Sequence, residues 1–298
     1  MPGIRMTLSE KIYQVLAHAG VILVALVCVA PFLFVVSASL TPQAVLQQYG
    51  GYVMFPPKVT FYAYQLALQT GQLLDAFVIS VARVLVGTSL HLALCSMAGY
   101  ALSKSYLFGR KVWLIILLIS FLFGPGLIPF FVLCRTLGLV NTFWIYVVPG
   151  AVSAWSIFIF RQFFMELPKE LEEAAILDGA DELQVLLRVV LPLSMPVYMA
   201  LGLFAAVGHW NDYLTSVIYI RDVGLYPVAM VLQSILTFAT GTSGLGQQML
   251  KDTELLKQIP GQSLKMATVV LSTIPILFVY PFLQKYFAKG MLTGAIKG

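Results

Sequence analysis

A short cluster of polar and aromatic residues, His209, Trp210, Asn211, Asp212 and Tyr213, interrupts an otherwise apolar stretch of the sequence. Amide and carboxylate groups hydrogen-bond to hydroxyl groups, and aromatic rings pack against C–H faces, so this combination suits a pathway for a sugar. His209 and Asp212 are three residues apart and would share one face of a helix. The alternative is helix–helix packing in which the tryptophan and the tyrosine anchor an interface.

The other residue types that commonly carry chemistry are scattered. His18, His91 and His209 are too far apart in the sequence to suggest a metal site. The three cysteines lie in or beside apolar runs without a C-x-x-C spacing, which favours packing thiols over ligands or disulfides. These cysteines are Cys28, Cys95 and Cys134. We therefore expect no metal, no cofactor and no catalytic residue in this chain.

The composition indicates that most of the chain is solvated by lipid. Of 298 residues, 59% are hydrophobic and 10% are charged, whereas soluble domains carry about 25% charged residues. The mean hydropathy is +0.89. A soluble enzyme, a nucleic-acid-binding protein and a disordered tail are excluded by these values. The net charge of +5 is better explained by the sorting of basic residues to the cytoplasmic side of a membrane than by an acidic partner.

Six apolar runs of 19 or more residues are each long enough to cross about 30 Å of hydrocarbon as a helix. Segments of alternating hydrophobicity typical of β-barrels are absent from the sequence. The first run follows two basic residues, as in a signal peptide, but its length and its missing cleavage site favour an uncleaved span. The runs cover residues 15–37, 77–103, 112–133, 141–160, 196–220 and 266–284.

Basic residues are distributed unequally over the connections between these runs. With a cytoplasmic N-terminus, the inner segments 1–14, 104–111, 161–195 and 285–298 hold eleven lysines and arginines, and the outer loops hold six. This asymmetry predicts that both termini are cytoplasmic. Residues 15–284 would then form the transmembrane domain, and residues 285–298 a basic cytoplasmic tail.

Only two charged residues, Arg83 and Asp212, fall inside the predicted spans. Charges within a membrane are rare and are functional by default. The depths of Arg83 and Asp212 in the membrane, counted from the outer ends of their spans, differ by about 3 Å. The residues either pair or share a watery cavity, or each one separately snorkels outward or meets backbone carbonyls.

Pro125 and Pro129 lie in the third run, within the sequence Gly124-Pro125-Gly126-Leu127-Ile128-Pro129. Proline removes a backbone donor and glycine relaxes the backbone, so this segment predicts a broken or kinked helix. The break could act as the hinge of a gate or could be a static kink that serves packing.

The charged segment 167–192 is the most informative stretch of the sequence, and it reads as two short helices. Pro168 suits a first helical position, Gly179 fits the left-handed residue that ends a helix, and Asp181 can cap the next helix, which Pro192 would stop. Leu171, Ala174, Ala175 and Asp178 recur at helical spacing and form a narrow face with small residues, suited to docking another protein. An amphipathic helix lying on the membrane is disfavoured, because residues 161–195 hold seven acids and three bases.

This segment resembles the EAA motif of ABC importer permeases. Glu173-Ala174-Ala175 is followed by Gly179 and then by Val189 and Leu191-Pro192, with valine where the family more often has isoleucine. The flanks 177–180 and 191–193, Trp210-Asn211-Asp212 and the ending 284–298 resemble the carbohydrate-uptake, maltose-type branch. Residues 263–267 and 280–284 are similar to permeases for polysaccharide-derived oligosaccharides.

The resemblance implies an all-α membrane protein of the type I ABC importer permease fold, with six spans in a bacterial inner membrane. A coupling helix between spans four and five would seat in a separate ATPase dimer, which binds ATP and Mg²⁺. A second, homologous permease would share the pore, and an extracytoplasmic binding protein would deliver the sugar. The coupling contact would be formed by Glu173, Ala174, Ala175, Asp178, Gly179, Leu191 and Pro192.

The sequence is consistent with this division of labour. No G-x-x-x-x-G-K-[ST] segment occurs, and the glycine-rich stretch 241–246 is not followed by Gly-Lys, so ATP is expected to be hydrolysed in trans by another subunit. An ion-coupled secondary transporter would predict inverted repeats and more intramembrane charges. A membrane-embedded enzyme would predict clustered His, Cys or Asp residues within the spans.

Overall fold

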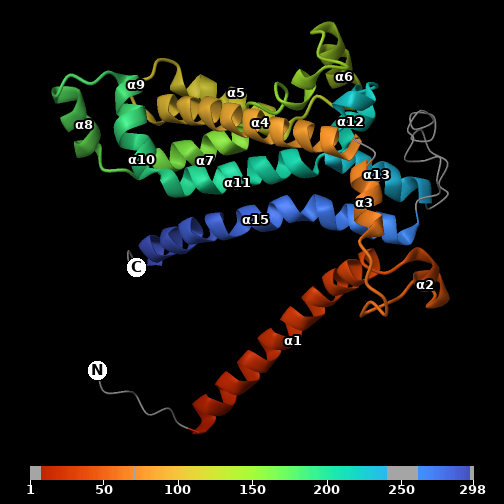
Figure 1. Ribbon diagram of the computed structural model, residues 1–298. Coiled ribbons are helices and arrows are strands. Elements are labelled where there is room, and N and C mark those ends of the chain that lie inside the picture. The colour runs from red at the N-terminus through yellow and green to blue at the C-terminus, as the bar shows by residue number, and fades with distance from the viewer. Residues whose placement is uncertain (1–7, 70–71, 240–260, 296–298) are drawn as a thin grey trace. The chain divides into compact units, whose positions relative to one another are not determined.

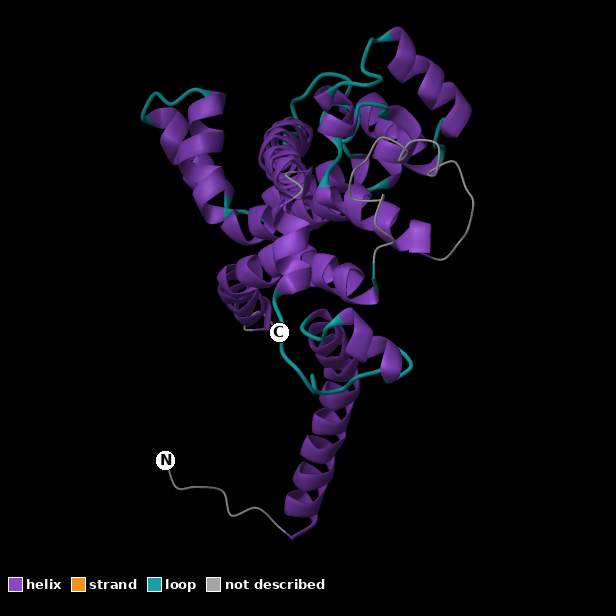
Figure 2. Cartoon of the chain, turned by 45° about the vertical axis from the view of Figure 1, so that its right-hand side comes forward, coloured by secondary structure: helices purple, strands orange, loops and turns teal. Residues whose placement is uncertain are grey.

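The computed structural model describes residues 8–69, 72–239 and 261–295 (Figure 1), with side chains described as far as Phe278. These residues form helices joined by loops, and no strand occurs among them (Figure 2). The chain divides into two compact units. Unit 1 comprises residues 1–70 and 252–273, and unit 2 comprises residues 71–251 and 274–298.

Unit 1 contains α1 (Leu8–Ser39), α2 (Gln43–Gln48), α3 (Tyr62–Gln69) and the first turns of α15 (Gln262–Ala295). Its small core consists of Ala38, Leu46 and Val53, with Phe34 and Met266 packed against it. The Ser263 hydroxyl donates to the Thr41 carbonyl at 2.8 Å. Most of α1 is apolar and exposed, as expected for a helix whose solvent is lipid.

Unit 2 is organised around α4 (Gln72–Ser103), a continuous helix of 32 residues that packs against α7 (Ala154–Met165) and α11 (Met195–Asn211). Small residues allow the backbones to approach closely. A Cβ at Gly99 would lie 2.7 Å from Cβ of Phe160, so glycine is needed where α4 meets α7. The core contains residues of α4, α7, α11 and the segment 185–190.

The remaining elements of unit 2 are shorter than α4 and follow one another through loops and turns. They are α5 (Arg110–Leu122), α6 (Leu127–Thr136), η1 (Phe143–Tyr146), α8 (Lys169–Leu177), α9 (Glu182–Val185), the π-helix η2 (Leu186–Val190), α10 (Leu191–Leu193), α12 (Leu214–Tyr219), η3 (Val223–Leu225) and α13 (Val228–Ala239).

Among the residues that the structure describes, two helices, α1 and α4, are individually long and apolar enough to span a membrane, and up to four spans result if each of two bent pairs counts as one. The pair α5 and α6 is bent by 115°. This break confirms the prediction from Pro125, since residues 123–126 are not helical and Gly126 has a positive φ of 75°. Pro129 lies in the first turn of α6, where its missing N–H costs nothing.

Three of the predicted spans differ from the structure. The run 141–160 is not one helix, because η1 ends at Tyr146 and α7 begins only after the Ser153 cap. The run 196–220 is divided, since α11 ends at Asn211 and α12 begins at Leu214. The last helix, α15, continues from Gln262 to Ala295, so residue 284 is no helix boundary.

The loop predicted for residues 221–265 contains a helix that the sequence reading missed. Residues Val228–Ala239 form the apolar helix α13. Its partners are in α4 and elsewhere in unit 2: the Ser80 hydroxyl accepts from the Val228 amide at 2.8 Å. The glycine-rich stretch 241–246 lies outside the described residues.

Candidate functional site

The predicted docking segment consists of α8 followed by α9, η2 and α10. Gly179, with a φ of +86°, ends α8 as predicted, because its N–H and that of Ala180 return to carbonyls of the last turn. Asp181 caps α9 in a full capping box with Gln184. Pro168 is the N-cap of α8 rather than its first helical residue.

Pro192 does not stop the second helix as predicted. The helix passes through Pro192 in α10 and turns at Ser194, where the axis bends by 86° into α11. The π-helix η2 immediately precedes the proline. A proline cannot donate to the carbonyl four residues earlier, and the wider π turn accommodates this missing hydrogen bond.

α8 presents most of its surface outward, and none of its residues is buried. Leu177 is 88% exposed, and Glu173, Ala174, Asp178 and Gly179 are exposed as well. An apolar side chain of this exposure beside small residues and carboxylates is suited to contact with another protein. Figure 1 shows α8 at the margin of the unit, joined to the bundle through α9 and α10.

The residues predicted for docking do not all share this exposed face. Ala175 and Leu191 are half-buried and pack against the core of unit 2. Pro192 is exposed. Val185, Leu186 and Val190 are fully part of that core, so the second half of the segment is anchored more deeply than α8, which contributes only the half-buried Ala175.

Two acids of the segment face the C-terminal end of α4. Glu172 of α8 forms an ion pair with Lys104, which directly follows α4. Glu182 of α9 accepts a hydrogen bond from Tyr100 at 3.0 Å and another from Tyr106. Sequence reasoning missed these residues. The signal was the charge pattern, since residues 104–111 hold three bases and no acid while residues 161–195 are acidic.

The same end of α4 is fixed by two arginines. Arg110 and Arg161 both donate from Nε to the Leu102 carbonyl, at 2.9 and 3.1 Å. The last carbonyls of a helix have no partner within the helix and carry partial negative charge, which guanidinium groups satisfy. The end of α4 is therefore a fixed point to which the docking segment is attached.

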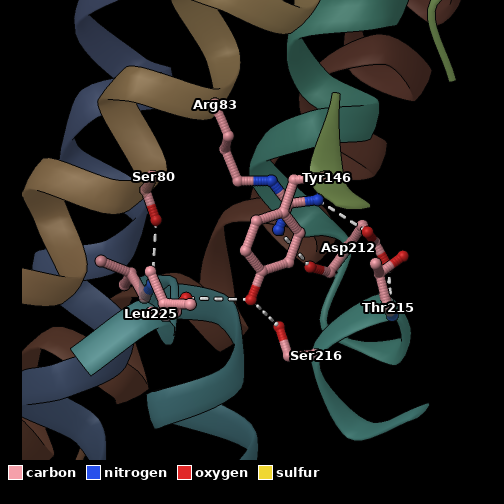
Figure 3. Close-up of polar contacts among 8 residues, drawn as sticks. Ser80, Arg83, Tyr146, Asp212, Thr215, Ser216 and Leu225 are labelled. Carbon is pink, nitrogen blue, oxygen red and sulfur yellow. Dashed lines mark hydrogen bonds and ion pairs between the residues drawn. The ribbon is translucent and has the colours of Figure 1, made fainter. Parts of the chain in front are cut away.

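The two charges predicted inside the membrane form an ion pair. Arg83 donates to the Asp212 carboxylate at 2.6 Å and to the Asp212 backbone carbonyl at 2.8 Å (Figure 3). The Arg83 side chain is 1% exposed, and the Asp212 side chain is 31% exposed. Of the alternatives left open by the sequence, pairing is the one observed.

The prediction that Asp212 shares a helix face with His209 is wrong. α11 ends at Asn211, and Asp212 has an extended backbone with a ψ of 109°. Its second carboxylate oxygen accepts from the Thr215 amide at 3.1 Å, which supports the start of α12 (Figure 3). Asp212 thus occupies the break between α11 and α12, and Arg83 holds it there.

Tyr146 of η1 completes the surroundings of Arg83. Its ring lies 4.3 Å from the guanidinium carbon, within the range of a cation–π contact. Its hydroxyl donates to the Leu225 carbonyl at 2.9 Å and lies 2.9 Å from the Ser216 hydroxyl (Figure 3). The buried tyrosine therefore joins η1, α12 and η3 around the ion pair, a role that its sequence context did not reveal.

The remaining residues of the polar cluster have different surroundings. His209 is half-buried, and its imidazole occupies the space that a Cβ at Gly87 of α4 would need. Trp210 is buried and packs against Phe77, with 6.2 Å between the ring centroids. Asn211 is exposed and Tyr213 is half-buried. The structure brings His209 and Asp212 to α4, while Asn211 is exposed.

A second polar contact joins α4 to α7 and the loop before it. His91 lies 2.9 Å from the Ser156 hydroxyl and 3.1 Å from the Gly150 carbonyl. Cys95 and Cys134 are buried, and Cys28 is exposed. Within the described parts of the chain, no three His, Cys, Asp or Glu side chains come together as a metal site.

Comparison with known families matches residues 66–293 to the binding-protein-dependent transport system inner membrane component family. The chain belongs to this family. Family members are permeases, the non-catalytic membrane subunits of ABC importers, and such importers in general also contain a partner permease, an ATPase and a substrate-binding protein.

Several relatives are similar over nearly their whole length. The chain is 34% identical to the polygalacturonan/rhamnogalacturonan transport system permease protein YtcP of Bacillus subtilis, covering 98% of this chain and 100% of the relative. It is 39% identical to the protein LplC of the same organism, covering 92% of this chain and 91% of the relative. It is 26% identical to the B. subtilis arabinooligosaccharides permease AraQ, covering 97% of each chain.

A solved structure also resembles this permease. A chain of a bacterial ABC transporter involved in the import of the acidic polysaccharide alginate matches with a TM-score of 0.83 and 27% identity, covering 96% of this chain and 100% of that chain. The helical architecture is therefore that of a type I ABC importer permease.

Proposed function

We propose that this permease forms one half of a heterodimeric pore that imports oligosaccharides released from a polysaccharide. The likeness to YtcP over the whole length of both chains carries this proposal. AraQ and the alginate importer support the same substrate class, since their names also specify chains of sugars. An ion-coupled mechanism has no support in these comparisons.

In this proposal the protein is a multi-pass component of a bacterial inner membrane with six spans and both termini in the cytoplasm. The exposed face of α8, with Ala174, Leu177 and Asp178, seats in the partner ATPase, which binds ATP and Mg²⁺. Closure of the ATPase dimer on ATP moves α8 and opens the pore outward. Such coupling requires that the docked ATPase has different affinities for the two pore states.

The break between α11 and α12 is proposed to border the sugar pathway. Asn211 is exposed at the end of α11, and the amide can bind sugar hydroxyls. His209, Trp210, Asp212 and Tyr213 shape the wall behind it. Because Asp212 is engaged by Arg83, we assign it to holding the break rather than to binding sugar directly.

Reconstitution of the complete complex tests the function. The permease pair, the ATPase and the binding protein are placed in lipid nanodiscs. The rate of ATP hydrolysis is then measured with binding protein that carries oligogalacturonides, arabino-oligosaccharides or maltose. We expect ATP hydrolysis to be stimulated by binding protein loaded with an oligosaccharide of the first two kinds, and to be stimulated less by binding protein loaded with maltose. A response to none of the sugars, with an intact complex, would refute the proposed substrate class.

Transport assays on Asn211→Ala and Asp212→Asn test the pathway. Asn211→Ala is expected to reduce sugar uptake while leaving assembly intact, because the side chain is exposed and makes no buried contact in the described structure. Unchanged uptake with Asn211→Ala would remove this residue from the pathway.

A further inference from the structure

The helix α8 has no buried residue, and yet it must transmit force if it docks on a motor. A helix attached only through its flanking loops would move on the ATPase without moving the pore. The contacts that join α8 and α9 to the rest of unit 2 therefore decide whether a displacement reaches the pore-forming helices.

Two carboxylates provide these contacts, one from each helix of the docking segment. Glu172 pairs with Lys104, and the two side chains are 16% and 13% exposed, so the pair is largely shielded from water. Glu182 uses both carboxylate oxygens, one for Tyr100 and one for Tyr106.

The two contacts are joined to each other on the side of α4. The Lys104 ammonium lies 4.1 Å from the centroid of the Tyr100 ring, within cation–π range. Lys104 therefore contacts Glu172 of α8 and also the tyrosine that binds Glu182 of α9. A cleft of about 420 Å³ lies beside this junction, lined by Tyr106, Glu172 and Met165 among others.

α4 is continuous between this junction and the ion pair at the α11–α12 break. Seventeen residues separate Tyr100 from Arg83, which corresponds to about 26 Å of helix. The helix between them is packed on α7 and α11 through glycines and other small residues, so it moves as a rigid body rather than bending locally.

We propose that Lys104, Tyr100 and Tyr106 form a clamp on Glu172 and Glu182, by which movement of α8 is passed to α4 and along it to the Arg83–Asp212 break. These are positioning residues for transport, and the inference rests on the proposed docking of α8 on the ATPase. The two-point attachment fixes the orientation of the docking segment as well as its distance, because a single contact would act as a pivot.

The test uses the complete complex and two clamp variants, Lys104→Met and the double variant Tyr100→Phe with Tyr106→Phe. The tyrosine variant removes two hydroxyls and retains both rings. Transported sugar and hydrolysed ATP are measured together in proteoliposomes. We expect the complex to assemble and hydrolyse ATP, while sugar transported per ATP falls about fivefold or more.

Lys111→Met is the matched control, because Lys111 follows in the same basic stretch, is exposed and has no ion pair among the described residues. Its ratio of sugar to ATP is expected to remain at the wild-type value. The exchanged pair Lys104→Glu with Glu172→Lys should recover part of the ratio lost by Lys104→Glu alone, and no recovery would mean that the two residues do not act as a pair.

The outcomes separate this inference from the function on which it rests. If wild-type complex transports sugar and both clamp variants keep the wild-type ratio, the clamp is refuted and the docking of α8 is untouched. If Lys104→Met fails to accumulate, the tyrosine variant alone decides, and an unchanged ratio there also refutes the clamp. Failure of wild-type permease to bind any ATPase refutes the proposed function instead.

Discussion

Two ion pairs involve α4 or its immediate end, and they differ in how the cation is held. Arg83 is 1% exposed and uses two hydrogen bonds to Asp212 together with the ring of Tyr146. Lys104 pairs with Glu172 on a helix that has no buried residue. Arginine offers a planar set of donors that fixes geometry, whereas lysine is a compact charge on a flexible stem.

The difference indicates two mechanical tasks. A break in a helix within an apolar surrounding needs every freed polar group satisfied, and Arg83 satisfies both the carboxylate and the carbonyl of Asp212. A docking segment that passes movement on needs a defined attachment, and here Lys104 holds Glu172 while Tyr100 and Tyr106 hold Glu182. Substitutions at the two sites should therefore affect stability by different amounts.

Arg83→Ala is expected to have the largest effect. It leaves the Asp212 carboxylate and carbonyl without their partner, and breaking a buried pair costs about 3–5 kcal/mol. The temperature at which the purified complex unfolds should fall strongly, and so should the yield of the complex in the membrane. The double variant Arg83→Met with Asp212→Leu should be closer to wild type in stability, because no charge is then left unpaired.

The reversed pair, Arg83→Asp with Asp212→Arg, adds a test of pairing. It should be more stable than either single variant, although the longer side chain now starts from the break. If Arg83→Ala unfolds at the same temperature as wild type, the contrast between the two ion pairs does not exist.

Gly99→Val is expected to cause the second-largest loss of stability. A Cβ at this position would lie 2.7 Å from Phe160 and 3.1 Å from the Ile157 carbonyl, so α4 and α7 must separate. Overpacking of this kind costs about 1–3 kcal/mol. Gly208→Val on α11 is the control, because a Cβ there meets no atom within 4 Å. Unfolding temperatures that fall equally for both variants would contradict the close approach.

Lys104→Met should lower stability by about 1–3 kcal/mol, less than Arg83→Ala, because Lys104 holds Glu172 through one ion pair whereas Arg83 makes two hydrogen bonds to Asp212. The contribution of this ion pair should also shrink as salt is added, since screening weakens pairs outside the bilayer. Unfolding of wild type and Lys104→Met at low and high ionic strength checks this expectation. A loss as large as that of Arg83→Ala would mean that both pairs serve the same structural task.

Local signals in the sequence predicted two of the helix ends in the docking segment, at Gly179 and Asp181, but not the roles of Pro168 and Pro192. Gly179 and Asp181 act where the chain needs a left-handed residue and a side-chain acceptor, and both requirements are visible in a few neighbouring residues. The break near Pro125 is local for the same reason. The identity of the fold came from the EAA-like segment, which the family match bears out.

Tertiary contacts decided what the sequence reading got wrong. The run 196–220 is apolar enough for one helix, and yet Asp212 leaves it to meet Arg83, which lies 129 residues away. Hydropathy measures composition and does not report such a partner. Likewise α13 was assigned to a loop because of the glycine-rich residues after it, whereas its start is held by Ser80 of α4.

A substitution on the exposed surface of α8 should have the smallest effect on stability. Such a substitution therefore separates an effect on docking from an effect on folding. Leu177 is 88% exposed, so Leu177→Asp removes almost no packing, and the free energy of unfolding of the permease pair should change by about 0.5 kcal/mol or less. The ATPase should nevertheless be lost on purification, because a charge is introduced into an apolar contact. Leu187→Asp, at another exposed leucine on the anchored half of the segment, is the comparison and should retain the ATPase. If both variants retain it equally, the exposed face of α8 is not where the motor binds, and the clamp at Lys104 has no movement of α8 to transmit.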